Sequence, residues 1–163
     1  MSKYTKIYLD MDGVIADFGK RYYELFHLTP KQGDLMGLFN EHFNAFIGSN
    51  HFSTLDMMPD AKILLEHLST LDIPIEILSS TARQDRTEAI SEQKRVWLIS
   101  HGINYPRNFV PGKSLKYTFA TPESIIIDDT LSVITDWTKA GGTAIHHTDA
   151  ASTIASLDAL LST

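Results

Sequence analysis

The sequence contains no cysteine among its 163 residues. This absence excludes disulfide bonds and thiolate zinc sites, and it is compatible with a reducing compartment. Basic residues are also fewer than acidic ones. The chain has 14 lysine and arginine residues and 20 acidic residues, so its net charge is −6. This balance disfavours a nucleic-acid polymer or an anionic membrane as the partner.

Long apolar runs are absent as well. No segment approaches the roughly 20 apolar residues of a membrane span. The first residues, MSKYTKIYLDMDG, reach acidic side chains too early for a secretory signal. We therefore expect no membrane association and a cytoplasmic location. Apolar residues still make up 43% of the chain, which is enough for one domain with a proper core.

Three common phosphate-binding or metal-binding motifs are missing. The dinucleotide fingerprint G-x-G-x-x-G does not occur. The segment PGKS at 111–114 resembles the end of a P-loop, but Arg107 stands where that loop needs its earlier glycine. A calcium loop starting at Asp10 fails at its later positions, where Arg21 replaces the required glutamate. The chemistry of this chain must rest on other residues.

Short apolar runs alternate with helical patterns along most of the chain. The runs are rich in β-branched residues, which is typical of buried parallel strands. The expected strands are 7–9, 73–78, 124–127, 143–145 and, more weakly, 108–110. The expected helices are 60–71, 86–101, 131–140 and 149–161. This alternation predicts an α/β fold with a mostly parallel sheet flanked by helices.

Residues 17–58 interrupt the alternation. This segment has no convincing strand but holds eight of the sixteen aromatic side chains. Their helical spacing predicts a small helical insertion after the first strand, with glycines 33, 37 and 48 near its turns. Most of these rings are expected to form the core of the insertion itself. The domain assignment is therefore a core of 1–16 and 59–163, with the insertion at 17–58.

Two of the apolar runs end in paired carboxylates. Asp10 and Asp12 follow the first run in IYLDMDGVIADF, and Asp128 and Asp129 end the run in ESIIIDDT. Ligands of open parallel sheets lie outside the carboxyl ends of the strands, so four carboxylates are expected in one crevice. Oxygen ligands without cysteine indicate a hard cation, and Mg²⁺ is the cofactor we expect. Either Asp128 or Asp129 alone would also serve as a helix cap.

Hydroxyl and ammonium groups accompany these carboxylates. The strand IEILSS ends in Ser79 and Ser80, whose hydroxyls are suited to hold a phosphoryl group, although serine at a strand end is also a common turn residue. Lys113 and Lys116 precede the second acidic pair, and either is a candidate to neutralise charge there.

The order of these pieces resembles a known family. DMDGV at one strand end, ILSS at another, a lysine and then IIIDD look like the four motifs of the haloacid dehalogenase superfamily. DMDGVIADF followed by a short helical insertion is similar to the 5'(3')-deoxyribonucleotidase branch. The resemblance implies a Rossmann-like core in which the insertion is the cap of the family.

The resemblance also implies roles for individual residues. Asp10 would be the nucleophile that forms an aspartyl-phosphate, and Asp12 would be the general acid and base. Asp10, Asp129 and the Asp12 carbonyl would hold Mg²⁺, with Asp128 supporting them. Ser79 would bind the phosphoryl group with Ser80 nearby. Lys116 matches the family lysine better than Lys113, because it begins a K…A…IIIDD pattern.

Substrate class is the finest inference from the sequence. Phe18 lies where the nucleotidase branch has a base-stacking phenylalanine, although it would also pack the base of the cap. Two departures are Thr130, where mammalian nucleotidases have arginine, and Ser79-Ser80-Thr81, where they have Thr-Ser-Pro. We expect a phosphomonoesterase for (deoxy)nucleoside monophosphates. The alternatives are another small phosphorylated metabolite, a nucleic-acid terminal phosphate, or a non-catalytic binding or regulatory protein, and the oligomeric state stays open.

Overall fold

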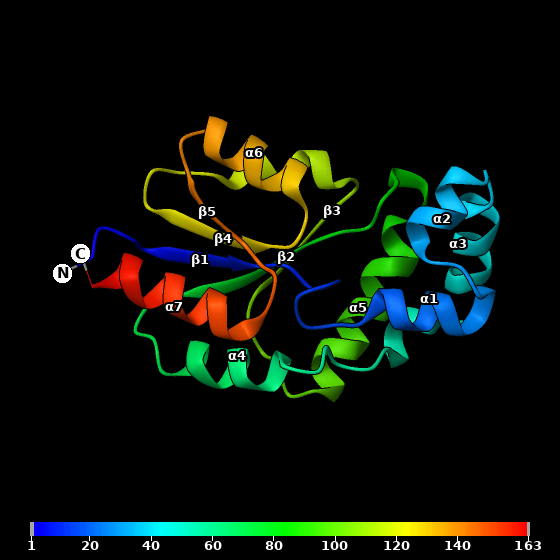
Figure 1. The fold of residues 1–163 in the computed structure, drawn as a ribbon, viewed down its shortest axis with the longest axis horizontal. Coiled ribbons are helices and arrows are strands. Elements are labelled where there is room, and N and C mark those ends of the chain that lie inside the picture. Colours follow the sequence, from blue (N-terminus) through cyan, green and yellow to red (C-terminus); the bar gives the residue numbers. More distant parts are fainter. Residues whose placement is uncertain (1, 163) are drawn as a thin grey trace.

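The computed structural model describes residues 2–162 and centres on one five-stranded parallel sheet (Figure 1). The strand order is β3-β2-β1-β4-β5, which puts the first strand in the middle. The strands are β1 (Lys6–Leu9), β2 (Ile75–Ser80), β3 (Arg107–Val110), β4 (Ser124–Asp128) and β5 (Thr143–His146). The α/β fold class expected from the sequence, with a Rossmann-like parallel sheet, is confirmed.

Both faces of the sheet are buried, which explains the almost continuous apolar runs. Alternate residues point to opposite faces, so Ile7 and Leu9 join one apolar cluster while Tyr8 joins the other. The same alternation separates Ile125 and Ile127 from Ile126. Helix α6 (Leu131–Lys139) covers one face, and helices α4 (Ala61–Ser69), α5 (Thr87–Ser100) and α7 (Ala150–Leu161) cover the other (Figure 1).

The predicted elements are present, with shifted ends. The strand expected at 73–78 begins at Ile75 and extends to Ser80. It starts after Pro74 because proline has no N–H to donate to a neighbouring strand. The carbonyl of Pro74 still accepts from the N–H of Ile7 at 3.0 Å. Within residues 2–162 no helix is long and apolar enough to cross a bilayer.

Three helices lie between β1 and α4 and extend beyond the sheet (Figure 1). They are α1 (Phe18–Phe26), α2 (Pro30–Leu35) and α3 (Phe39–Gly48), followed by a short 3-10 helix at His51–Thr54. Gly33 does not mark a turn as expected, but lies inside α2. A side chain there would overlap the Tyr22 hydroxyl, so the glycine lets α2 pack closely on α1.

Candidate active site

Two acidic strand ends meet at the centre of the sheet. Strands β1 and β4 are neighbours, and the N–H of Asp10 donates to the Ile127 carbonyl at 3.0 Å. Asp10 therefore lies beside Asp128 at the carboxyl edge. The chain leaves β1 towards β2 on one side and β4 lies on the other, so this is the point where the strand order reverses. Such a switch point is where open α/β sheets bind ligands.

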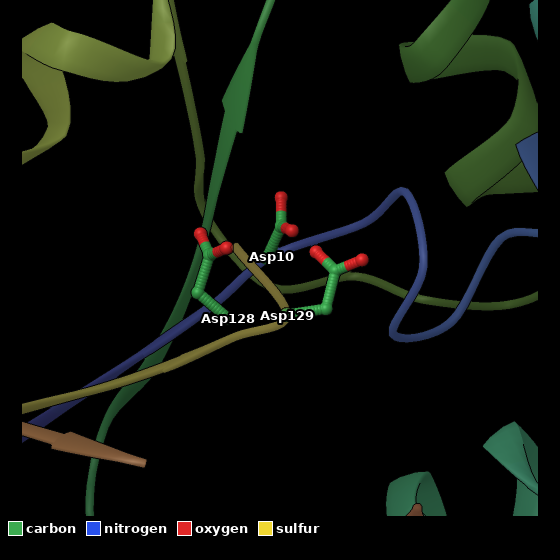
Figure 2. A group of neighbouring side chains, drawn as sticks. All are labelled: Asp10, Asp128 and Asp129. Atoms are coloured by element: carbon green, nitrogen blue, oxygen red, sulfur yellow. The ribbon is translucent and has the colours of Figure 1, made fainter. Parts of the chain in front are cut away.

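Three carboxylates converge at this edge. Figure 2 shows the side chains of Asp10, Asp128 and Asp129 gathered around one region, and one oxygen of each lies within 4.8 Å of the others. Asp10 and Asp128 are buried, while Asp129 is more open. Asp128 also accepts from the N–H of Thr130, the residue that precedes α6, at 2.9 Å.

Gly13 explains why the first acidic pair is followed by glycine. Its φ of +83° belongs to the left-handed region, which glycine tolerates best. A Cβ atom there would overlap the carboxylate of Asp129. The turn between residues 11 and 16 is closed by the Met11 carbonyl, which accepts from the N–H groups of Ile15 and Ala16 at 2.9 Å each. Glycine thus allows the loop after β1 to lie directly against the second acidic strand end.

Lys116 lies between two of the carboxylates. Its ammonium donates to Asp10 Oδ1 at 2.8 Å and to Asp128 Oδ2 at 2.7 Å, and the residue is only 2% exposed. Burial alone would lower the pKa of this ammonium, but the two carboxylates outweigh burial and raise that pKa. Lys113, the other candidate, lines the same cleft as Lys116, but no hydrogen bond joins it to the acidic groups among the described residues. The geometry therefore brings Lys116, rather than Lys113, into contact with the acidic cluster.

The cluster still carries more negative charge than Lys116 offsets. Burial raises the pKa of Asp10, and Asp128 adds to this while Lys116 opposes it. Burial, followed by the charges of Asp10 and Asp128, raises the pKa of Asp129 to about 8. Carboxylates held this close ionise together only beside a further positive charge. An all-oxygen donor set of this kind fits Mg²⁺, with Asp10 and Asp129 as candidate ligands and Asp128 beside them.

Asp12 has a different cation. Its Oδ2 accepts from the ammonium of Lys94 on α5 at 2.9 Å. The same ammonium donates to Ser79 Oγ at 2.7 Å and to the Ser80 carbonyl at 2.8 Å. Asp10 and Asp12 are thus each hydrogen-bonded to a different lysine.

The two serines occupy different environments. Ser79 is 1% exposed and its hydroxyl accepts from Lys94. Ser80 lines the cleft, and its Oγ accepts from the N–H of Ala82 at 2.9 Å. Ala82 has a φ of +65°, so the chain turns sharply after β2. Both serines therefore lie at the end of β2 beside the acidic groups, but only Ser80 belongs to the cleft surface in the described part of the chain.

A cleft of about 510 Å³ joins the acidic cluster to the helices after β1. One end, which we call the floor, contains Asp10, Asp12, Lys116 and Asp129. The other end, the aromatic wall, contains four phenylalanines from the expected insertion: Phe18, Phe39, Phe43 and Phe52. Phe18 stacks on Phe52 with ring centres 5.6 Å apart and meets Phe46 edge-on at 5.0 Å. Phe18 therefore both lines the cleft and packs the insertion.

Lys94 is the residue that sequence reasoning missed. It lies on the buried face of α5 between Ile90 and Trp97, and these residues with Leu98 follow the spacing i, i+4, i+7, i+8. A lysine inside an apolar helical stripe must be buried and therefore needs acceptors. That signal was present in the sequence, but nothing local indicated that Asp12 was its partner.

Solved structures share this fold at low sequence identity. A hydrolase from Streptococcus pneumoniae TIGR4 matches with a TM-score of 0.55 and 16% identity, over 96% of this chain and 99% of that chain. A D,D-heptose 1,7-bisphosphate phosphatase from Burkholderia thailandensis matches with a TM-score of 0.52 and 10% identity, over 94% of this chain and 97% of that chain. No family model and no curated protein matches the sequence. These similarities show the fold.

Proposed function

We propose that this protein is a Mg²⁺-dependent phosphomonoesterase of the haloacid dehalogenase type, acting on (deoxy)nucleoside monophosphates. The observation that carries the proposal is the paired arrangement at the switch point. Asp10 is held by Lys116 beside two further carboxylates, and Asp12, two residues on, is held by Lys94. This arrangement suits a nucleophile and a separate proton carrier acting on one phosphate.

The first step transfers the phosphoryl group to the protein. An Asp10 carboxylate oxygen forms a bond to phosphorus while the ester bond to the leaving oxygen breaks. Asp12 acts as the general acid and gives a proton to that oxygen, so the product leaves as a neutral alcohol. Lys116 donates two ammonium protons to Asp10 and Asp128, and its position on the cleft lets the third meet a phosphoryl oxygen.

The second step releases phosphate. Asp12 is now a carboxylate and takes a proton from a water molecule, which attacks phosphorus as the bond to Asp10 breaks. Phosphate leaves, Asp10 returns as a carboxylate and Asp12 is protonated again, so the cycle is balanced. Mg²⁺, when bound by Asp10, Asp129 and the Asp12 carbonyl, would offset the negative charge of phosphate and carboxylates.

The aromatic wall supports a nucleotide as substrate. A phosphate on the floor leaves the rest of the molecule in the same cleft, facing rings from the helices after β1. Every nucleobase has a flat face that stacks on such rings. A sugar phosphate, the substrate class named for the Burkholderia phosphatase, would find few polar partners on that wall. The net charge of −6 also disfavours the terminal phosphate of a nucleic-acid polymer.

A panel of phosphate esters tests the proposal. Purified protein would be incubated with nucleoside 5'- and 3'-monophosphates, sugar phosphates and p-nitrophenyl phosphate, with Mg²⁺ or with excess EDTA, and phosphate release would be measured. We expect Mg²⁺-dependent turnover with nucleotides as the best substrates. Better turnover of sugar phosphates would overturn the nucleotide assignment. Absence of turnover with every ester would favour the non-catalytic alternative.

A further inference from the structure

Lys94 is among the most deeply buried charged side chains in the described residues. It is 1% exposed and lies in the middle of α5, where Gln93, Trp97 and Leu98 are also buried. A buried ammonium without partners is strongly unfavourable, so its acceptors account for its presence. Asp12, Ser79 and the Ser80 carbonyl each accept one hydrogen bond from it, at 2.7 to 2.9 Å.

These three hydrogen bonds use every proton of the ammonium. Lys94 has none left for a phosphoryl oxygen, and among the described residues it is not part of the cleft surface. It therefore differs from Lys116, which lines the cleft and donates to only two carboxylates. A role as a direct phosphate ligand does not suit this geometry.

The hydrogen bonds instead determine how the side chains of Asp12 and Ser79 are oriented. Lys94 holds Asp12 by Oδ2, while Oδ1 is shielded from solvent and has no hydrogen-bond partner in residues 2–162. Asp12 lines the cleft, so the hydrogen bond from Lys94 determines how its carboxyl group faces a bound ester. Because the Ser79 oxygen accepts from Lys94, its own O–H must point to a different acceptor.

We propose that Lys94 is a positioning residue that orients Asp12 for proton transfer to the leaving group. The inference rests on the proposed phosphatase function and adds to it a residue from helix α5. Rigid support of this kind matters because proton transfer requires the carboxyl group within hydrogen-bond reach of the leaving oxygen.

Leaving-group dependence provides the test. Ethyl phosphate releases a strongly basic alkoxide, whereas p-nitrophenyl phosphate releases a weak base that needs little protonation. General acid catalysis contributes about 10²- to 10⁴-fold. Lys94→Met should therefore lower kcat/KM for ethyl phosphate by about that factor, and for p-nitrophenyl phosphate by less than about tenfold. The ratio kcat/KM is used because it reports the first chemical step.

A matched control separates positioning from stability. Ile90 is buried one turn before Lys94 on α5, packs in the apolar core and is not among the residues that line the cleft. Ile90→Ala should lower the Tm but change both esters alike. If Lys94→Met also changes both esters alike while the wild type is active, the positioning role is overturned and the phosphatase function stands.

The absence of cysteine allows a chemical rescue. Lys94→Cys introduces the only thiol, which can be alkylated with 2-bromoethylamine in the unfolded state to form a lysine analogue before refolding. We expect the modified protein to recover most of the lost ethyl phosphate activity, and the unmodified protein to lack it. Failure of the refolded analogue to recover that activity, with wild type refolded in parallel as active as before, would overturn the proposal. A wild type that hydrolyses neither of these two esters nor any nucleoside monophosphate would overturn the proposed function and this inference together.

Discussion

The two ends of the cleft are built in opposite ways. The floor is a set of charges from distant parts of the chain, in which short hydrogen bonds from lysines hold Asp10 and Asp12. The aromatic wall comes largely from residues 18–52 and is held by ring contacts at 4.8 to 5.9 Å. Directional hydrogen bonds determine the positions of atoms, whereas ring contacts tolerate several arrangements.

The difference assigns separate tasks to the two ends. Catalysis requires the positions of the reacting atoms to be held to within about half an ångström, and the hydrogen bonds of the floor provide that constraint. Recognition of a flat ring requires area and shape, which the wall provides. Changes at the floor should therefore reduce the rate of reaction, and changes at the wall should alter which substrate is preferred.

The largest effect is expected at the centre of the floor. Asp10→Asn keeps the shape of the side chain but removes the nucleophile, so turnover should fall by at least about a thousandfold. Phosphate release measures the rate, and circular dichroism checks the fold. A folded variant with more than about a tenth of the wild-type rate would refute the assignment of Asp10.

The next effect concerns the edge of the floor. Asp129→Ala removes a charged oxygen ligand that water replaces poorly, so the Mg²⁺ concentration for half-maximal activity should rise about 100-fold. A Mg²⁺ titration of activity measures this shift. Full wild-type activity in excess EDTA would contradict a metal role for the whole cluster.

At the wall, a pair of variants on one helix isolates stacking from packing. Phe18→Ala should raise KM for a nucleoside monophosphate about 5- to 150-fold, the range for stacking on one base. Phe26→Ala is the control, because Phe26 lies at the other end of α1 and stacks on His42 rather than lining the cleft. Both variants should lose Tm through lost packing. Equal KM values in the two variants would leave Phe18 with a packing role only.

The smallest effect is a pH dependence of stability. The pKa of Asp129 is raised from 3.8 to about 8 in the folded protein, so this group binds its proton more tightly when folded. Its contribution is therefore present at acidic pH and is lost as the pH rises through about 8. Without metal, the wild-type Tm should fall between about pH 6 and about pH 8.5 relative to that of Asp129→Asn.

Magnesium should reverse this loss. A cation competes with the proton on Asp129, so the increase in Tm on adding Mg²⁺ should be larger near pH 8.5 than near pH 6. Thermal unfolding at both pH values, with and without Mg²⁺, measures the difference. A Mg²⁺ effect that is the same at both pH values would argue against Asp129 as a ligand.

Local patterns in the sequence were sufficient to predict the sheet. The β-branched runs and their spacing predicted five strands, because a strand buried on both faces must be apolar along its whole length. They also predicted that Asp10 and Asp128 lie at the same edge of the sheet, since parallel strands align their carboxyl ends. The predicted ends of β2 were less accurate, because Pro74 limits the start of the strand only through a missing hydrogen bond.

The tertiary structure alone decided which side chains meet. Lys94 and Asp12 are 82 residues apart, and Lys116 and Asp10 are 106 apart. The pattern before the second acidic pair favoured Lys116, but nothing in the sequence paired Lys94 with Asp12. The requirement for glycine at position 13 likewise depends on Asp129, which follows β4. Hydrophobic periodicity specifies elements because it is a local property, whereas the pairing of charges depends on strand order and helix packing, which no single segment encodes.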